Sequence, residues 1–393
     1  MKSKEVKVIL GVDAISPPLT GIGRYTYELA RGLHQSGEVE ARFFALARWI
    51  ADPAALIDPQ RPSAVLRRNM AHIPFSGLLR QAYQRTSRWI FAQEVRKLRG
   101  YLYHSPNFYM VPFEGPTIAT IHDLSVIHHP EFHPEERVAF MQRELPLALQ
   151  RSDHLITVSE YVRKDIIETY RIAPERISVT PLGVDPAYHP RSDETLATTL
   201  AGYGLIPRGY ILCVATLEPR KNIARLVEAF CTLPQALQLR FPLVLVGDRG
   251  WKSDDLHHVL ESLQTQGRAR YLGFVPEQHL PLMYSGARLF AYPSLSEGFG
   301  LPVLEAMASG VPVITSNCTS LPEVAGYAAI LIDPTDVALL RDSMQAFLEN
   351  DELCETYVQK GLAQAQGFTW PAFVEKTIDI YREVALRHAV TSG

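Results

Sequence analysis

The stretch ARLFAYPSLSEGFGLPVLEAMASGVPVITS, residues 287–316, decides the fold class. It holds two short apolar runs, 287–293 and 311–316, separated by a glycine-rich turn and a short helical segment. Pro302 suits the first turn of a helix, and Gly310 suits its end. Apolar runs that do not alternate with polar residues predict strands covered on both faces, and therefore a parallel sheet. The stretch predicts a strand, a helix and a second strand parallel to the first.

The same alternation, in which a short apolar run is followed by a segment with helical periodicity, continues in both directions along the chain. Ten further runs belong to it: VKVILGV (6–12), RFFALA (42–47), YLYHS (101–105), TIATIH (117–122), HLITVS (154–159), ISVTPL (177–182), YILCVAT (210–216), PLVLVG (242–247), ARYLGF (269–274) and AAILID (328–333). All runs together divide six and six about residues 185–209, which are rich in Pro, Gly and polar residues. This order predicts an α/β protein with two doubly wound halves. Because ligands of open α/β sheets bind beyond the carboxyl ends of the strands, we expect one cleft between the two sheets.

The composition excludes several classes of protein. A length of 393 residues exceeds what one hydrophobic core usually supports, and a net charge of -3 provides no overall field for nucleic acid. The four cysteines (Cys213, Cys231, Cys318 and Cys354) form no C-x-x-C pair, which favours reduced thiols over a disulfide framework or a zinc site. No apolar run suits a membrane span or a cleaved signal peptide. We expect a soluble cytoplasmic protein, or one that sits on the inner face of the membrane without crossing it.

Two acids and two glycines follow the strand at 287–293. Gly298 and Gly300 allow a ligand to approach the backbone closely, and Glu297 can accept hydrogen bonds from sugar hydroxyls. Glu305 falls about one turn into the next helix, whose free amides can hold a phosphate or sugar oxygen. For Glu305 alone, stabilisation of the helix dipole is an equally good interpretation. No structural need explains the whole set, so we favour a ligand site.

Two cations, Arg220 and Lys221, lie in the segment TLEPRKN (216–222), at the exit of the apolar run that begins at residue 210. Adjacent cations at the exit of a strand can neutralise a diphosphate. A leaving nucleoside diphosphate gains negative charge as a glycosidic bond breaks, so fixed cations stabilise the transition state more than the ground state. An Arg-Lys pair alone is usually a solvated surface. Together with the acids and glycines of 297–305, it favours a diphosphate site.

The first half carries two weaker signals. Gly21 and Gly23 form a Gly-x-Gly turn that opens a helix and can place amides against a phosphate, although the full dinucleotide fingerprint is missing. His122, followed by Asp123, closes a strand at its carboxyl end and faces the expected cleft. It can act as a general base or hold a sugar hydroxyl. A hydrogen-bonded loop histidine is an equal alternative.

The group His128, His129, Glu131 and His133 suggests a metal site at first sight. Its spacing matches no helical His-Glu-x-x-His pattern, and a proline interrupts the run, so we expect no metal there.

Segment 67–99 is locally basic. Seven arginines and Lys97 accompany a single acid, Glu94, with aromatic and aliphatic residues between them. Cationic charge with aromatics at helical spacing suits an anionic membrane surface. An ordinary surface helix with an inward apolar stripe explains the pattern equally well.

The second half resembles the family 4 retaining glycosyltransferases of GT-B fold, in particular bacterial mannosyl- and rhamnosyltransferases of O-antigen and exopolysaccharide assembly. The matching stretches, in order, are TLEPRKN (216–222), LVGDRGW (245–251), YLGFVPE (271–277), YPSLSEGFGLPVLEAMASGVPVITSN (292–317) and SLPEVAG (320–326). Some members carry a further Arg six residues before the Lys. This chain has Ala215 there, so that part of the phosphate grip is missing.

The resemblance implies a role for each matching residue. Glu297 would contact the donor sugar, Glu305 the ribose, and Arg220 with Lys221 the diphosphate, while His122 would orient the donor sugar. The implied catalytic residues are His122, Arg220, Lys221 and Glu297. The implied donor-binding residues are Gly21, Gly23, Arg220, Lys221, Phe274, Val275, Glu297, Gly298, Phe299, Gly300, Leu301 and Glu305, with the loop at 274–275 against the base.

The resemblance further implies a GT-B fold of two Rossmann-like domains. Residues 1–190, with 371–393 crossing back, would present the acceptor, and residues 191–370 would bind the nucleotide sugar. The implied activity is retaining transfer of a hexose, preferably mannose or a deoxyhexose from a GDP-sugar, to an oligosaccharide or polyprenyl-diphosphate-linked acceptor. We expect no metal or other cofactor, because the Asp-x-Asp that holds a cation in other glycosyltransferases is absent.

Three alternatives remain at this point. The donor could be a UDP-sugar. A GT-B-fold sugar-nucleotide epimerase would use the same cleft but would need acid and base groups around the sugar. A two-lobed periplasmic sugar-binding protein would carry a signal peptide and would need no diphosphate grip.

Because no residue stands out as a nucleophile, we expect front-face attack with the leaving phosphate as base.

Overall fold

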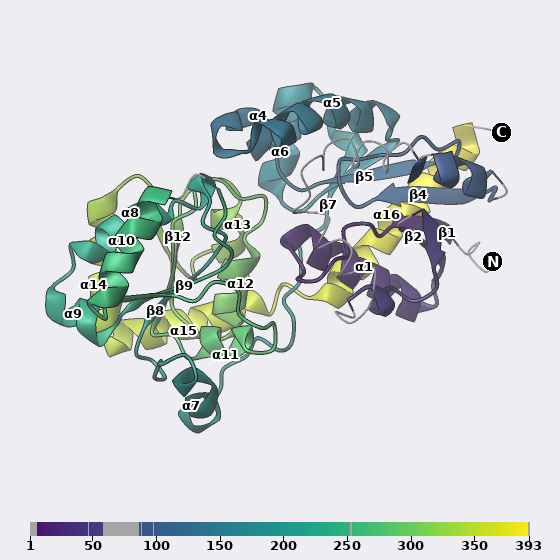
Figure 1. Cartoon of the computed structure of the whole chain (residues 1–393). Coiled ribbons are helices and arrows are strands. Elements are labelled where there is room, and N and C mark those ends of the chain that lie inside the picture. Colours follow the sequence, from purple (N-terminus) through teal and green to yellow (C-terminus); the bar gives the residue numbers. More distant parts are fainter. Residues whose placement is uncertain are drawn as a thin grey trace.

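The computed structural model describes residues 6–45, 47–57, 86–87, 89–96, 98–251 and 254–391. It contains two α/β domains, each built on one sheet (Figure 1). Both sheets are parallel but for one edge strand, which confirms the predicted fold class.

The first sheet has seven strands in the order β3-β2-β1-β4-β5-β6-β7. They are β1 (Val6–Gly11), β2 (Val39–Ala45), β3 (Arg48–Ile50), β4 (Tyr101–Ser105), β5 (Thr117–Ile121), β6 (His154–Thr157) and β7 (Ile177–Val179). Only β3 runs antiparallel, against β2 at the edge. The sequence did not predict β3, because three residues are too few to show an apolar run.

Helices and short 3-10 turns connect these strands: α1 (Gly21–Ser36), η1 (Pro53–Leu56), α4 (Ser125–His128), η2 (Pro130–Phe132), α5 (Glu135–Arg151), α6 (Glu160–Tyr170) and η3 (Pro174–Arg176). Along β1, Val8 and Leu10 belong to one hydrophobic cluster and Ile9 to another. Both faces of the strand are therefore buried, which explains the nearly continuous apolar run in the sequence.

The second sheet has six parallel strands in the order β10-β9-β8-β11-β12-β13. They are β8 (Ile211–Val214), β9 (Leu243–Val246), β10 (Ala269–Tyr271), β11 (Leu289–Tyr292), β12 (Val313–Ser316) and β13 (Ile330–Ile332). The helical elements around them are α7 (Asp193–Ala201), η4 (Pro219–Lys221), α8 (Ile223–Cys231), α9 (Gln235–Arg240), α10 (Asp254–Thr265), α11 (Leu280–Ser285), α12 (Leu301–Ala308), α13 (Leu321–Ala325), α14 (Val337–Glu349) and α15 (Asp351–Ala365).

Two segments cross between the domains side by side. Val184 forms a parallel bridge with Thr369. A β-carbon on Gly183 would lie 2.1 Å from the amide nitrogen of Trp370, so only glycine allows this approach. From this crossing α16 (Trp370–Thr391) runs away from the second domain and packs along α1 of the first (Figure 1).

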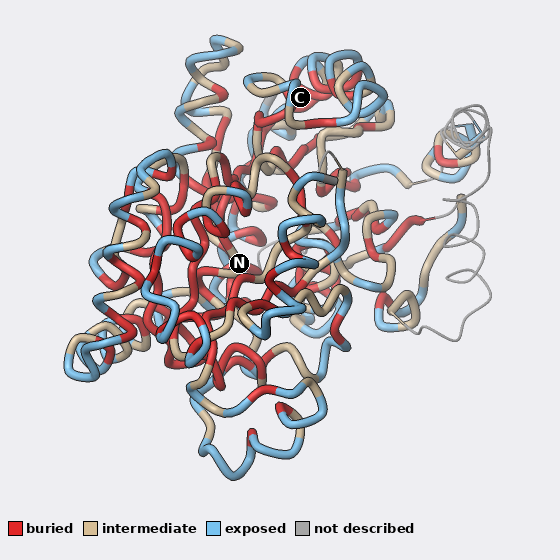
Figure 2. Tube along the Cα trace, turned by 60° about the vertical axis from the view of Figure 1, so that its left-hand side comes forward, coloured by how far each residue is buried: buried red, intermediate tan, exposed pale blue. Residues whose placement is uncertain are grey.

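Buried residues concentrate in the strands and on the inner sides of the helices, and exposed residues lie on the outer turns (Figure 2). Among the described residues, no helix combines the length and the apolar character needed to cross a membrane. Most of segment 67–99, for which the sequence suggests membrane contact, lies outside the described residues.

The carboxyl ends of the two sheets meet at the domain boundary. His122 follows β5 of the first sheet, whereas Arg220 and Glu297 follow β8 and β11 of the second. The second domain's Gly298 lies directly against the backbone of His122. The residues that follow these strands therefore form one site.

Candidate functional site

Arg220 lies in the η4 turn after β8 and is held on both edges of its guanidinium. Its Nε and Nη2 donate to Oε1 of Glu218 at 3.1 and 2.7 Å. Its Nη1 donates to the carbonyl oxygen of Ser296 at 2.7 Å and to Oε2 of Glu297 at 3.0 Å. Burial acts to lower the pKa of Arg220, but the surrounding carboxylates outweigh it and raise that pKa. The guanidinium is a fixed positive charge.

Lys221 and Glu297 form a close ion pair beside it. The Lys221 Nζ donates to Oε1 of Glu297 at 2.6 Å and to the Tyr292 hydroxyl at 2.7 Å. The Tyr292 hydroxyl donates in turn to the same Oε1 at 2.8 Å. Burial acts to raise the pKa of Glu297, but Lys221 and Arg220 outweigh it and lower the pKa to about 2. Burial and the neighbouring Arg220 lower the pKa of Lys221, against the effect of Glu297. The structure thus brings three of the predicted catalytic residues into one cluster of ion pairs.

Hydrogen bonds from Ser320 hold the backbone of the glycine-rich loop between β11 and α12. Gly300 caps α12 with a φ of 113°, a conformation that favours glycine. The hydroxyl of Ser320 lies 2.9 Å from the carbonyl oxygens of both Glu297 and Phe299. Phe299 is buried, and Leu301 begins the helix. The Phe299 side chain therefore packs in the core, whereas the backbone of Phe299 forms part of the loop.

Glu305 occupies a different environment within α12. It lies beside the phenol groups of Tyr188 and Tyr284, and burial raises its pKa to about 7. The two acids of the predicted pair therefore differ: Glu297 is ionised at neutral pH, whereas burial favours the protonated form of Glu305. A partly protonated carboxyl can donate to or accept from the hydroxyls of a ribose.

The loop after β10 presents one aromatic side chain. Phe274 is 60% exposed, whereas Val275 is only 5% exposed and belongs to the core. Two residues further on, Glu277 pairs with Arg24 at the start of α1 in the first domain. Phe274 is thus available for stacking on a planar ring, and Val275 supports the loop from within.

The two glycines at the start of α1 have different surroundings. Thr20 caps the helix by accepting the amide hydrogen of Gly23 at 3.2 Å. A β-carbon on Gly23 would lie 3.0 Å from the carbonyl oxygen of Ala14, whereas one on Gly21 would meet nothing within 4 Å. Gly23 is packed against the loop after β1, and Gly21 faces open space.

His122 is held as a neutral imidazole. Its Nε2 lies 2.9 Å from the carbonyl oxygen of Pro106, so Nε2–H donates there. Burial lowers its pKa. Its ring meets the Tyr25 ring edge-on, with centroids 4.8 Å apart. Nδ1 is then an acceptor that can receive a hydrogen bond from a sugar hydroxyl.

A buried chain of hydrogen bonds fixes the Tyr25 ring that supports His122. The Tyr25 hydroxyl lies 2.8 Å from Oγ1 of Thr120, which lies 2.8 Å from Nε2 of His104. His104 Nδ1 lies 2.7 Å from the Tyr381 hydroxyl of α16. Burial lowers the pKa of His104 to about 3, so its ring is neutral. Sequence reasoning missed this network, because its members are far apart in the chain and form no motif.

Asp123 is a further candidate for a functional residue. The sequence alone gave it no role of its own, only a place next to His122. Its Oδ1 accepts hydrogen bonds from the amide and the hydroxyl of Ser125 at 3.0 and 2.6 Å. Burial acts to raise the pKa of Asp123, but Arg220 and Ser125 outweigh it and lower that pKa. A carboxylate of the first domain therefore faces the cation of the second.

Further contacts hold the two domains together around this site. Ser159 donates its hydroxyl to the carbonyl oxygen of Gly298 at 2.7 Å. The Glu323 carboxylate accepts the amides at the start of α6 at 2.9 and 3.3 Å. The Trp251 indole donates to the carbonyl oxygen of Phe132 at 2.7 Å. The structure therefore represents a closed arrangement of the domains.

The histidines near residue 130 take separate partners. His128 lies 2.7 Å from Oδ1 of Asp165, and His133 lies 3.1 Å from the Ser125 hydroxyl. Within the part of the chain that the structure describes, no three His, Cys, Asp or Glu side chains are grouped so that they could hold a metal ion.

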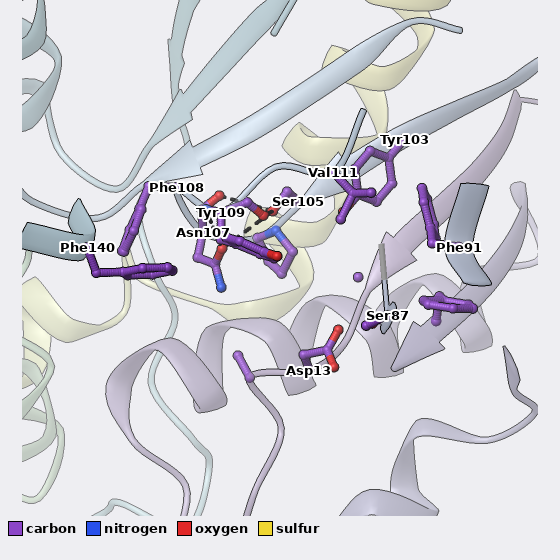
Figure 3. A pocket seen from close by; sticks show the side chains of 14 residues that line it. Asp13, Ser87, Phe91, Tyr103, Ser105, Asn107, Phe108, Tyr109, Val111 and Phe140 are labelled. Atoms are coloured by element: carbon purple, nitrogen blue, oxygen red, sulfur yellow. Dashed lines mark hydrogen bonds between the residues drawn. The ribbon is translucent and has the colours of Figure 1, made fainter. Parts of the chain in front are cut away.

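A cavity of about 280 Å³ opens in the first domain beyond the carboxyl ends of β1 and β4 (Figure 3). Aromatic residues form much of its wall, and Asp13 and Asn107 add polar groups. Asn107 Oδ1 accepts the amide of Tyr109 at 2.8 Å, which leaves its NH₂ group toward the cavity. Pro106, which holds His122, also lines it. The cavity and His122 are therefore adjacent.

Two facing parallel-sheet domains, with a cation pair and acids at the ends of the strands between them, define a GT-B glycosyltransferase. Family models match both halves. The model for glycosyltransferase family 4 covers residues 19–188, and the model for glycosyl transferases group 1 covers residues 207–364. The chain belongs to glycosyltransferase family 4 and is a glycosyltransferase.

Two relatives are mannosyltransferases by name. The O-antigen chain mannosyltransferase B of Escherichia coli is 39% identical over 380 residues, which span 96% of this chain and 100% of that protein. The serotype-specific mannosyltransferase WbdA of Escherichia coli is 33% identical over 263 residues, which span 65% of this chain but 32% of that longer protein.

Solved structures share the fold at low sequence identity. A sucrose-phosphate synthase from Thermosynechococcus elongatus superposes with a TM-score of 0.75 at 20% identity, covering 97% of this chain and 99% of that one. WaaG, a glycosyltransferase involved in lipopolysaccharide biosynthesis, gives 0.70 at 17% identity and covers 95% and 99%. These similarities confirm the GT-B fold.

Proposed function

We propose that the protein transfers mannose from GDP-mannose onto a growing O-antigen or related surface polysaccharide. The observation that carries this proposal is the cluster of Arg220, Lys221 and Glu297, whose neighbour Gly298 packs on the His122 backbone across the domain boundary. The choice of mannose is supported by the names of the two Escherichia coli relatives. A GDP-deoxyhexose would fit the same site.

The donor would lie with its diphosphate at Arg220 and Lys221, where fixed positive charge favours the leaving group as it becomes more negative. Its ribose would reach Glu305, and its base would stack on the exposed ring of Phe274. Its sugar would then lie between Glu297 and the Nδ1 of His122.

The acceptor would enter the cavity beside His122. Aromatic side chains pack against the apolar face of a sugar, and carboxylate and amide groups bind its hydroxyls. Asp13 and Asn107 supply both kinds of polar group in this cavity, together with the rings of Phe108 and Phe140 (Figure 3). This fits an oligosaccharide end, carried on a polyprenyl diphosphate or free.

We further propose transfer with retention of configuration, without a metal ion and without a covalent sugar–protein intermediate. The attacking hydroxyl would approach on the side of the leaving diphosphate, whose oxygen takes its proton. Trapping a covalent adduct with a fluorinated donor would contradict this proposal.

Attachment to the inner face of the cytoplasmic membrane through segment 67–99 is a proposal that rests on the sequence alone. Binding to anionic vesicles at low salt, with release at high salt, is the expected result. If the protein stays in solution in both conditions, there is no such contact.

A donor screen tests the function. The protein is incubated with GDP-mannose, GDP-fucose, UDP-glucose or UDP-galactose and a mannosyl acceptor, and transfer is followed by mass spectrometry. We expect transfer from GDP-mannose. Transfer only from UDP-sugars would overturn the choice of donor. Conversion of a donor into a different nucleotide sugar, without any acceptor, would identify an epimerase, whereas a transferase would at most hydrolyse the donor slowly.

A further inference from the structure

The two cations expected to hold the donor diphosphate are already bridged by one carboxylate. Each oxygen of Glu297 takes one of them: Oε1 accepts Lys221 at 2.6 Å, and Oε2 accepts Arg220 at 3.0 Å. All three side chains are largely buried, with 9 to 15% of each exposed. A diphosphate would present the same feature, neighbouring anionic oxygens shared between the two cations.

The hydrogen-bond capacity of the cations is mostly used. Lys221 has three N–H donors, and two of them point to Glu297 and Tyr292. Of the five N–H donors of Arg220, four point to Glu218, Ser296 or Glu297. A diphosphate therefore cannot be fully bound while Glu297 keeps its place.

We propose that Glu297 occupies, before the donor binds, the place that the donor diphosphate then takes. Donor binding displaces its carboxylate from Lys221 and Arg220, and the freed carboxylate turns to accept hydroxyls of the donor sugar. This inference rests on the proposed function, because it needs a diphosphate-bearing donor in this cleft.

Two acids contact Arg220, and Glu297 is the one that the diphosphate displaces. Glu218 stays in place, because it binds the opposite edge of the guanidinium. Glu218 lies two residues before Arg220 and takes Nε and Nη2, whereas Glu297 takes Nη1. Lys221 keeps the Tyr292 hydroxyl at 2.7 Å when Glu297 leaves. Glu218 and Tyr292 therefore keep the cations aligned throughout the exchange and are positioning residues.

The exchange gives Glu297 two tasks. Before the donor binds, its negative charge keeps two like-charged side chains together in a buried place, where their mutual repulsion would otherwise separate them. In the occupied site it binds the sugar. The consequence is a competition: the free enzyme binds diphosphate more weakly than its two cations alone would allow.

Inorganic pyrophosphate tests this competition, because it carries neither sugar nor base. Its binding is measured by calorimetry on the full chain at fixed ionic strength, for the parent, Glu297→Gln and Glu218→Gln. Both variants remove one negative charge near the cations. We expect Glu297→Gln to bind pyrophosphate about tenfold more tightly, because a competing charge-assisted interaction is gone. We expect Glu218→Gln to bind no more tightly than the parent, because Arg220 loses its alignment.

If pyrophosphate affinity rose equally in both variants, the cause would be the lost negative charge in general, and the proposal would be overturned. Unchanged or weaker pyrophosphate binding in Glu297→Gln would also overturn it. Glu297→Asp provides a second variant if Glu297→Gln does not fold. Its shorter carboxylate reaches only one cation, so we expect an intermediate gain, and an affinity equal to the parent's would likewise contradict the exchange. Transfer activity should fall in Glu297→Gln while pyrophosphate affinity rises. Because pyrophosphate binding needs no particular donor, an incorrect choice of GDP-mannose leaves this result intact.

Discussion

The carbonyl oxygen of His122 lies 1.9 Å from the position that a β-carbon on Gly298 would occupy. Gly298 belongs to the loop between β11 and α12 of the second domain, and His122 directly follows β5 of the first. The absence of a side chain at Gly298 is therefore required by the opposite domain in the closed arrangement. Ser159 strengthens the same contact by donating to the carbonyl oxygen of Gly298 at 2.7 Å.

Gly298→Ala should prevent this closure. The added methyl group collides with backbone, which cannot move aside as a flexible side chain can, so His122 and the donor would be held apart. We expect kcat of transfer to fall about 100-fold, as small displacements of reacting groups do. Thermal stabilisation by the donor should persist, because the second domain still binds it. Gly367→Ala is the control, since its β-carbon would make only an ordinary contact at 3.5 Å. Parent-like kcat in Gly298→Ala would contradict this role.

Glu305 makes stability depend on pH. Its pKa is about 7 in the folded protein, above the ordinary value of 4.5, because it is buried. Between these two values the unfolded chain releases the proton while the folded chain keeps it. The contribution of Glu305 to the free energy of unfolding therefore falls as the pH rises from 4.5 to 7, by up to about 3 kcal/mol.

Glu305→Gln should remove this contribution, and urea unfolding of the parent and the variant at pH 5 and pH 7.5 measures the difference between their slopes. The opposing contribution of buried neutral histidines such as His104 is the same in both proteins and cancels. Glu297 does not interfere, because its pKa of about 2 makes its stabilisation fade only as the pH falls below 4.5. Equal slopes in the parent and in Glu305→Gln would contradict the raised pKa.

Tyr381→Phe should destabilise the first domain. It leaves Nδ1 of His104 without its partner in a fully buried place, which costs about 1–3 kcal/mol. Urea unfolding measures the loss, and Tyr327→Phe serves as the control because Tyr327 is 96% exposed. We also expect a lower kcat with an unchanged donor KM, since the network ends at the ring beside His122. If Tyr381→Phe unfolds like the control, the network contributes no stability.

Asn107→Asp tests the acceptor cavity. The aspartate keeps an oxygen for the amide of Tyr109, so the turn is preserved, but it loses the NH₂ group toward the cavity. We expect the acceptor KM to rise about tenfold, the effect of about 1.4 kcal/mol, while the donor KM stays unchanged. Initial-rate kinetics with varied acceptor measure this. A change confined to the donor KM would place the acceptor elsewhere.

The elements of the fold followed from local pattern. Strands buried on both faces, such as β8 and β11, have continuous apolar runs, and the glycine and proline signals around α12 mark its ends. β3 escaped prediction because an edge strand of three residues has no such run. The grouping of Arg220, Lys221 and Glu297 was predictable for a related reason: parallel strands place their carboxyl ends at one edge of the sheet.

The sequence by itself determined the two α/β halves, their boundary region and the residue types that follow each strand, because these depend on neighbours within a few positions. Only the tertiary structure decided the partners and charge states of those residues. Glu297 binds the cations, Glu305 lies among tyrosines, and Asp123 faces Arg220. Such outcomes depend on burial and on distances between residues far apart in the chain, such as His104 and Tyr381. No local pattern encodes them.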